Sequence, residues 1–254
     1  MKRGNWKIRI FIGVAIVAFA FIKKCSNTEE NPYTGREQHI TMTSDQEIAI
    51  GLQSAPGMAQ QHGGLYPDEK LQTFVKKVGN RLVNNSIAKD TPYQYDFHLL
   101  ADDQTINAFA LPGGQCFITY ALFSQLNEAQ LAGVMGHEIG HVIGRHSAER
   151  IADSQTWQTA TMGATVGAGD MGSIVGSIGQ NTLLKNGRND ELESDELGVL
   201  FMIKAGYDPY EMIKVMEILK AAGGPNRVPE FQSTHPDPAN RIEKIKAAIE
   251  KYQE

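Results

Sequence analysis

Residues 137–141, which read HEIGH, constrain this chain more than any other stretch of its sequence. Positions four apart lie on one face of a helix, so the imidazoles of His137 and His141 can bind one metal ion from the same side. Glu138 can reach a water molecule on that ion without being a ligand. Zinc suits this pattern because a catalytic zinc site combines three protein ligands, often imidazole, with one open position. The motif predicts one zinc ion per chain, with Glu138 as the catalytic base.

The residues around this motif predict a buried helix. Asn127 and Gln130 match a capping pair at a helix start. The apolar side chains that follow are too dense for a solvated surface helix: Leu131, Val134, Met135, Ile139 and Val142. The alternative interpretation is a chance match on a helix with two surface histidines, and these apolar neighbours argue against it.

The position of a third ligand distinguishes classes of zinc enzyme. In the pattern HExxHxxGxxH of metzincins, the glycine would fall at position 144 and a third histidine at position 147. This chain has Gly144 but carries Ser147, and His146 comes one residue early. A shift of one residue points a side chain elsewhere, so we interpret His146 as a non-ligand.

Acidic residues farther along the chain are the remaining candidates. Residues 191–196 read ELESDE, and on a helix Glu191 and Asp195 would lie one turn apart on one face. Glu191 could then complete the zinc ligands, while Asp195 could accept the other ring N–H of a ligating histidine. The alternative is a solvated acidic helix face. Apolar residues follow at 197–203, however, and indicate that this helix has a buried side.

Two stretches, HEIGHVIGRHSAER from residue 137 and RNDELESDELG from residue 188, resemble the gluzincin zinc metallopeptidases. The resemblance is to the family of HtpX-type bacterial proteases and the CaaX prenyl protease, which is peptidase family forty-eight of the metallo class. Residues 107–114 resemble the strand and turn before the metal helix of that family. Residues 233–236, with Arg241 beyond, resemble its C-terminal motif. One departure is Ser194, where the family commonly has alanine.

The resemblance implies an α+β fold, a mostly helical zincin-like domain with a small antiparallel sheet beside the HExxH helix. Glu191 is then the third zinc ligand. In this family a sheet edge beside the site binds the substrate as an added strand, and an open edge can pair with any extended backbone. Asn107, Ala108 and Phe109 are the candidate edge. The alternative is that they form an ordinary strand of the sheet.

The C-terminal motif implies two more site residues. His235 has two possible roles, donating to the developing oxyanion or capping the zinc in a resting state. Arg241 is expected to hold Asp195 or the adjoining loop in place.

The N-terminus predicts export from the cytoplasm. Four basic residues within positions 1–9 precede an uninterrupted apolar run over 10–22. This is the layout of an export signal, and residues 18–20 offer a cleavage site. The run is short for a span of about twenty residues. Lys23 and Lys24 nevertheless fit the end of an anchor. We therefore expect residues 1–25 to be an export signal or an inner-membrane anchor, and the protein to be periplasmic or in the cell envelope.

The rest of the chain predicts one linker and one domain. Residues 26–44 are polar and turn-rich, and residues 45–254 form the metallopeptidase domain. Ser44 and Glu47 predict a capped helix to about residue 53, residues 93–100 a strand, and residues 107–120 a hairpin. The glycine-rich residues 160–179 predict a flap or a loosely packed helical segment that could gate the site, or a membrane-seeking helix.

These observations predict metal-assisted hydrolysis of peptide bonds. Export and pairing at a sheet edge favour unfolded or misassembled cell-envelope proteins as substrates. The alternatives are a narrow processing peptidase and a zinc-holding chaperone or binding protein with little turnover. The net charge of -5 gives no indication of nucleic-acid binding, and no basic cluster interrupts the part of the chain that is expected to fold, so nucleic acid is not an expected partner. The two cysteines, Cys25 and Cys116, give little reason to expect a disulfide, so Cys116 is predicted to be a buried free thiol.

Overall fold

The computed structural model describes residues 6–222, 231, 235 and 240–253. It is mostly helical with two small sheets, which is the predicted α+β class. The N-terminal part contains α1 (Trp6–Ser26), β1 (Thr28–Glu30), β2 (Glu37–His39), α2 (Ser44–Gln61), α3 (Glu69–Asn84) and η1 (Ile87–Asp90). The middle contains β3 (Asp96–Leu100), β4 (Ala108–Ala110), β5 (Gln115–Thr119), α4 (Tyr120–Phe123) and α5 (Glu128–Ile143). The remainder contains α6 (His146–Ala168), α7 (Met171–Lys204), α8 (Glu211–Ala222) and α10 (Arg241–Gln253).

The chain divides into two compact units. The first consists of the residues up to Met42 together with Ser147–Gly187, and the second of Thr43–His146 together with Arg188–Glu254. The second unit contains every described residue of the predicted site. Of the predicted C-terminal motif, Ser233, Thr234 and Pro236 lie outside the described residues.

The sheet of the second unit has the order β3-β5-β4. β4 and β5 form the predicted hairpin, pairing antiparallel with Phe109 opposite Phe117. Its turn is possible because Gly113 and Gly114 adopt positive φ angles of 82° and 112°. The prediction of an antiparallel sheet is wrong for one pair of strands, because β3 and β5 pair in parallel. The hairpin is predictable from its turn residues, but which of its strands lies beside β3 is a matter of tertiary packing.

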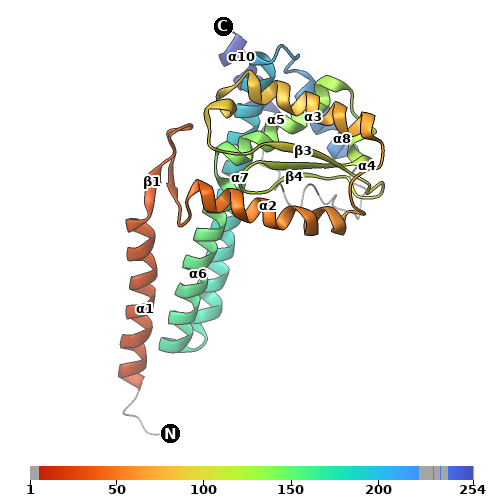
Figure 1. Cartoon of the computed structure of the whole chain (residues 1–254). Coiled ribbons are helices and arrows are strands. Elements are labelled where there is room, and N and C mark those ends of the chain that lie inside the picture. The colour runs from red at the N-terminus through yellow and green to blue at the C-terminus, as the bar shows by residue number, and fades with distance from the viewer. Residues whose placement is uncertain (1–5, 223–230, 232–234, 236–239, 254) are drawn as a thin grey trace. The chain divides into compact units, whose positions relative to one another are not determined.

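Helices cover both faces of this sheet (Figure 1). On the face toward α2, Leu100, Phe109 and Phe117 form an apolar cluster with side chains of that helix. On the other face α3 crosses β3, where Phe97 packs so close to Gly79 that a Cβ at Gly79 would lie 2.4 Å from its ring. The sheet therefore lies between α2 and α3.

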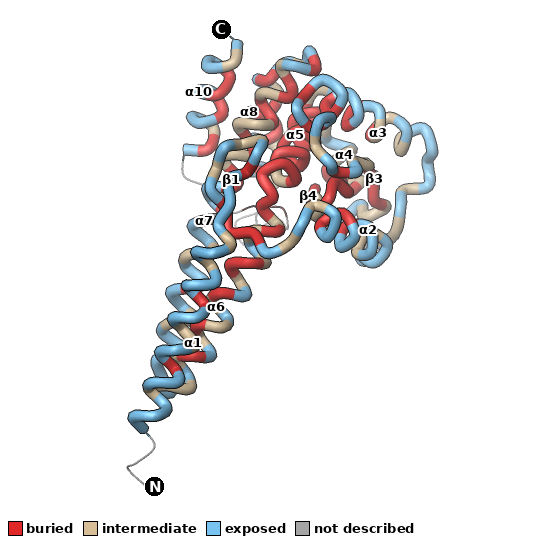
Figure 2. Tube along the Cα trace, turned by 60° about the vertical axis from the view of Figure 1, so that its left-hand side comes forward, coloured by how far each residue is buried: buried red, intermediate tan, exposed pale blue. Residues whose placement is uncertain are grey.

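Helix α5 is the most deeply buried helix of the second unit (Figure 2). Its first turn is closed by a capping box between Asn127 and Gln130, as predicted. It packs against α7 at two glycines. A Cβ at Gly136 would lie 3.2 Å from the Cα of Gly198, and one at Gly140 would lie 2.9 Å from the Cα of Ser194. This close approach brings the acidic part of α7 onto the histidines of α5.

The C-terminal helices complete the core of the second unit. Side chains of α7, α8 and α10 form one apolar cluster: Val199, Met202, Met212, Ile245, Ala248 and Ile249. Gly206 ends α7 with a positive φ of 74°, as the sequence predicts for a helix terminus.

The start of α2 differs from the prediction. The capping box of α2 uses Thr43 and Gln46, one residue before the predicted pair of Ser44 and Glu47. The helix then continues through Pro56 to Gln61, beyond the predicted end. Helix α7 begins at Met171, far before the acidic segment, since the glycine-rich residues are themselves helical.

The first unit contains helices and a β-hairpin. Residues 26–44, which we predicted as a linker, contain the antiparallel pair β1–β2, with Glu29 opposite Gln38. Buried His39 contacts Asp153 of α6 at 2.9 Å, and Lys24 of α1 pairs with the same carboxylate at 2.7 Å. The polar sequence thus forms an ordered network.

Helices α1 and α6 pack closely through small residues in this unit. A Cβ at Gly13 would lie 2.6 Å from the Cα of Gly167, and the predicted glycine-rich residues supply the end of α6 and the start of α7. The predicted apolar run 10–22 lies within α1. Within the described part of the chain, no helix is both long and apolar enough to cross a membrane.

Candidate metal centre

Helix α5 brings the two histidines of the HExxH motif to one point. The Nε2 atoms of His137 and His141 lie 3.0 Å apart. Because the two residues are one helical turn apart, their rings leave the same face of α5. The His137 side chain is 3% exposed and the His141 side chain 11% exposed, so the two imidazoles face the protein interior rather than bulk water.

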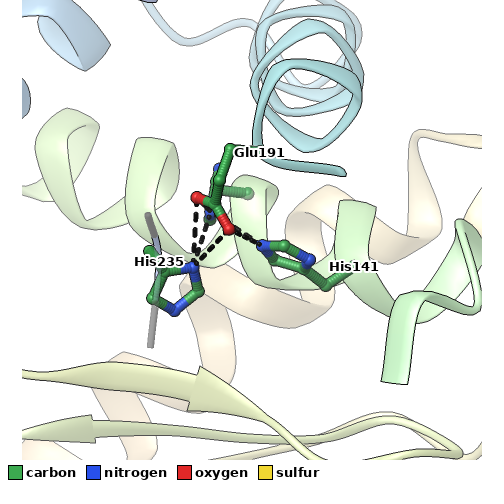
Figure 3. Close-up of side chains that lie close together, drawn as sticks. His141, Glu191 and His235 are labelled. Carbon is green, nitrogen blue, oxygen red and sulfur yellow. Dashed lines mark hydrogen bonds and ion pairs between the residues drawn. The ribbon is translucent and has the colours of Figure 1, made fainter. Parts of the chain in front are cut away.

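Glu191 and His235 close the cluster from other elements (Figure 3). The two carboxylate oxygens of Glu191 lie 3.3 Å from the Nε2 atoms of His137 and His141. Nδ1 of His235 lies 3.1 Å from Glu191 and 3.3 Å from Nε2 of His137. Among the described residues, these four side chains place one ligand atom each within 4.8 Å of all the others.

The spacing of these atoms fits a tetrahedral zinc ion. Four ligands at about 2.0–2.1 Å from a central ion would lie about 3.3–3.4 Å from one another. The separations of 3.0–3.3 Å between the nitrogen and oxygen atoms are close to this value. Three imidazole nitrogens and one carboxylate are also a donor set that zinc accepts. The residues present therefore fit the implied metal.

The ionisation of two donors also suits a metal. Burial lowers the pKa of His141 well below its usual value, which keeps this imidazole neutral. Burial opposes the charged form of Glu191, but His235 and the other two histidines outweigh it and hold the pKa of this carboxyl well below its usual value. A neutral imidazole and a carboxylate are the forms that bind metal.

His137 behaves differently from His141. Burial opposes its charged form, but hydrogen bonds to Asp195 and Glu191 outweigh the burial and raise its pKa to about 9. A metal ion must therefore displace a proton from this ring at neutral pH.

Glu138 lies beside this cluster, and its carboxylate accepts no hydrogen bond from the described residues. The residue is fully buried. Nε2 of His235 lies 3.6 Å from its Oε1. Burial raises the pKa of Glu138. A buried carboxylate with free lone pairs and a raised pKa beside a metal cluster is suited to accept a proton.

Asp195 and Arg241 orient one of the histidines. Nδ1 of His137 lies 2.8 Å from Asp195, so its N–H donates to the carboxylate and Nε2 is left for the cluster. Arg241, the first residue of α10, grips the same carboxylate with Nε at 2.6 Å and Nη2 at 2.8 Å. Burial opposes the charge on Asp195, but Arg241 and His137 lower its pKa.

The predicted substrate edge lies beside the cluster. Strand β4 is at an edge of the sheet and pairs only with β5 within the described strands. Nε2 of His235 lies 3.3 Å from the carbonyl oxygen of Ala108. Asn107 directs its backbone toward Thr119, while Phe109 packs in the apolar cluster under α2. The structure thus brings the candidate edge and the metal cluster together.

His146 lies near the cluster, and the sequence indicated no role for it other than that of a possible ligand. Nδ1 of His146 lies 2.9 Å from Nδ1 of His141, on the side away from the cluster. Its position two residues after Gly144, which caps the end of α5, could have suggested a contact with that helix.

Comparison with known proteins agrees with this geometry. Residues 69–249 match the family described as Peptidase family M48. The chain is 32% identical over 248 residues to the beta-barrel assembly-enhancing protease of Escherichia coli O157:H7, an alignment of 91% of this chain and 48% of that protein. It is 31% identical to the protein of the same name from Yersinia pestis, over 83% of this chain and 45% of that protein.

A second group of relatives is mitochondrial by name. The chain is 28% identical to the mitochondrial metalloendopeptidase OMA1 of Schizosaccharomyces pombe, over 99% of this chain and 74% of that protein. It spans about half the length of the bacterial relatives that it matches. The family match covers most of the chain and includes the HExxH helix and the acidic helix. The chain therefore belongs to peptidase family M48, the metallopeptidase family that its motifs resemble.

Proposed function

We propose that this protein is a zinc-dependent endopeptidase in which His137, His141 and Glu191 hold the ion. The observation that carries the proposal is the donor cluster with the buried carboxylate of Glu138 beside it, which accepts no hydrogen bond from the described residues. A purely structural zinc site needs four ligands and has no use for a fifth group of this kind. This argues against a zinc-holding binding protein, the alternative from another functional class.

The residues of the site have separate tasks in hydrolysis. Bound by this cluster, zinc supplies a Lewis acid that polarises the scissile carbonyl and makes water more acidic. Glu138 takes the proton of the attacking water and passes it to the leaving amine. Asp195, held by Arg241, keeps the His137 tautomer that presents Nε2 to the ion.

His235 defines a resting arrangement in this proposal. Its Nδ1 lies at hydrogen-bonding distance from Glu191 and near His137, where it would be a fourth ligand. A catalytic zinc keeps one position open for water or substrate. Of the two roles predicted for His235, the geometry supports capping of the resting site, because the ring would occupy the position that a catalytic site leaves open.

The substrate class follows from the sheet edge and from the relatives. An extended peptide added beside β4 would place its backbone against the carbonyl of Ala108, next to the cluster. Backbone pairing selects for extended conformation rather than for one sequence. The names of the bacterial relatives refer to the assembly of beta-barrels. Together these support quality control of unfolded or misassembled cell-envelope proteins, with a narrow processing peptidase as the second candidate.

The N-terminal helix supports a location at a membrane surface of the cell envelope. Trp6, Phe11, Phe19 and Ile22 of α1 are each more than half exposed. Large apolar side chains clustered on one element mark an interaction surface. Recovery of the full chain with the membrane fraction after cell lysis is the expected result. Recovery of all of it in the soluble fraction would contradict this location.

Degradation of casein by the full chain, beside its Glu138→Gln variant, tests the function. Glutamine keeps the shape of the side chain but cannot accept the proton, so we expect at least a 100-fold loss of cleavage with zinc binding intact. Chelation should abolish cleavage by the unmodified protein, and zinc should restore it. If neither protein cuts while both bind one zinc ion, the broad-specificity proposal fails and the narrow peptidase leads.

A further inference from the structure

His146 is deeply buried and lies between a proposed metal ligand and a carboxylate. The residue is 2% exposed. Its Nδ1 lies 2.9 Å from Nδ1 of His141, and its Nε2 lies 2.8 Å from Oε2 of Glu193. The ligand set described above does not include it. Three side chains from three segments therefore form one continuous chain of hydrogen bonds that ends on the metal cluster.

The backbone between α5 and α6 turns His146 back onto His141. Arg145 adopts a φ of 55°, a left-handed conformation that is uncommon for residues other than glycine. Its side chain is held by Glu47, whose Oε1 lies 2.8 Å from the Arg145 Nε. A Cβ at Gly144 would lie 2.3 Å from the His146 ring, so the ring occupies space that only a glycine leaves open. The turn is built around this position of the ring.

The hydrogen bonds permit one arrangement of protons. His141 presents Nε2 to the cluster, so a metal-binding His141 carries its proton on Nδ1. That N–H donates to Nδ1 of His146, which must then accept and carry its own proton on Nε2. The Nε2–H of His146 in turn donates to Glu193. The opposite tautomer of His146 would place two N–H groups against each other at 2.9 Å.

We propose that His146 is a positioning residue which, together with Glu193, selects the tautomer and ring orientation of His141 that bind metal. The inference rests on the proposed function, because it assigns His141 as a ligand. His137 is oriented directly by a carboxylate, because its Nδ1 lies 2.8 Å from Asp195. At His141 an imidazole stands between the ligand and the carboxylate. A group that fixes a ligating histidine in this way typically contributes a factor of about 10–100 in metal affinity.

A second metal ion bound by His146, Asp190 and Glu193 is the competing interpretation, since these residues also offer three ligand atoms close together. The distances favour the hydrogen bond. Nε2 of His146 lies 2.8 Å from Glu193, a normal hydrogen-bond length, but 3.9 Å from Oδ1 of Asp190. The number of zinc ions bound per chain separates the two interpretations.

The test is the zinc affinity of the full chain, measured by competition with a chromophoric chelator. His146→Leu keeps apolar volume but removes both ring nitrogens, and we expect zinc affinity to fall about 10–100-fold. His146→Asn is smaller, but its Oδ1 accepts a hydrogen bond where Nδ1 did, so we expect it to recover most of the loss. If His146 only filled space, leucine would be tolerated and asparagine would not.

Two further variants keep the test decisive. Ser194→Ala is the matched control, because its hydroxyl lies 3.3 Å from Nδ1 of His146 but both bonds of the chain remain without it, so affinity should not change. Glu193→Leu removes the terminal acceptor from a side chain that is 20% exposed, so it provides the answer if His146→Leu fails to fold. We expect Glu193→Leu to lower affinity in the same direction.

The outcomes separate this inference from the proposed function. Unchanged zinc affinity in folded His146→Leu or in Glu193→Leu would overturn the inference, and so would two zinc ions per unmodified chain. An unmodified chain that binds no zinc would overturn the proposed function itself. An unmodified chain that binds one zinc and cleaves casein, beside variants of full affinity, would refute only the role of His146.

Discussion

Zinc affinity should depend steeply on pH because of one histidine. The pKa of His137 is raised to about 9, since Asp195 and Glu191 outweigh the effect of burial. At pH 7 zinc must therefore displace a proton from a ring that is about 99% protonated, which weakens affinity about 50-fold relative to pH 9, where half of the rings are already deprotonated. His141 and Glu191 have pKa values well below their usual ones and are already deprotonated in this range. We expect affinity to rise about tenfold per pH unit between pH 6 and pH 8, and less steeply as the pH reaches 9.

The stability of the metal-free protein should change in the opposite direction. A histidine whose pKa rises from 6.5 to about 9 on folding contributes stability that is fully present below pH 6.5. This contribution is lost as pH rises through 9. Its size is about 3 kcal/mol, from about 1.4 kcal/mol per pKa unit. As the pH rises, the metal-free protein therefore becomes less stable while its affinity for zinc increases, because both quantities depend on the same proton of His137.

Two measurements check this reasoning. Chelator competition between pH 6 and pH 9 gives the affinity, and urea unfolding of the metal-free chain gives the stability over the same range. His137→Gln is the control for the second measurement, because without the imidazole the fall in stability toward pH 9 should be absent. An affinity that does not change with pH, or metal-free stability that rises from pH 6.5 to pH 9, would refute the reasoning.

Two more predictions concern the supports of the site. Gly140→Ala would press a methyl group onto the backbone of α7 at 2.9 Å, so we expect a loss of about 1–3 kcal/mol and weaker zinc binding. Gly57→Ala is its control, since a Cβ at that helical glycine would meet no atom of another segment within 4 Å, and the change should stabilise by about 0.5–1 kcal/mol. Arg241→Met removes the guanidinium that pairs with the buried carboxylate of Asp195 and should cost about 3–5 kcal/mol in urea unfolding. Lys251→Met removes an exposed ion pair with Glu196 and an exposed contact with the Tyr252 ring, and should leave the unfolding midpoint nearly unchanged. Equal effects of the two glycine variants would contradict the packing argument. Equal effects of Arg241→Met and Lys251→Met would contradict the argument from the buried ion pair.

Local patterns in the sequence predicted the parts of the site that depend on one helix or one turn. The spacing of His137 and His141 and the capping pair Asn127 and Gln130 are properties of a single helix, so no tertiary information was needed to place them. The same holds for the hairpin turn at residues 112–114. Hydrogen bonding between near neighbours and helical periodicity are enough to specify such elements.

The family resemblance supplied what periodicity could not. Spacing alone left Glu191 open between a ligand and a solvated acid, and gave no reason to connect Arg241 with Asp195. In the structure these residues lie within hydrogen-bond distance of the histidine cluster or of each other. Long-range pairs of this kind depend on how helices pack, which a single sequence does not state.

The sequence by itself determined which chemistry the chain can carry out, because the HExxH and ELESDE segments place the needed groups on two helical faces. Only the tertiary structure decided how these faces meet. The glycines of α5 let α7 approach within van der Waals contact, the left-handed Arg145 turned His146 onto His141, and strand order placed β4 rather than β5 at the edge. The physical reason is that steric fit between distant segments and the closure of hydrogen bonds across them are properties of the packed chain. Neither of these properties produces a repeating pattern of residue types that could be recognised in the sequence.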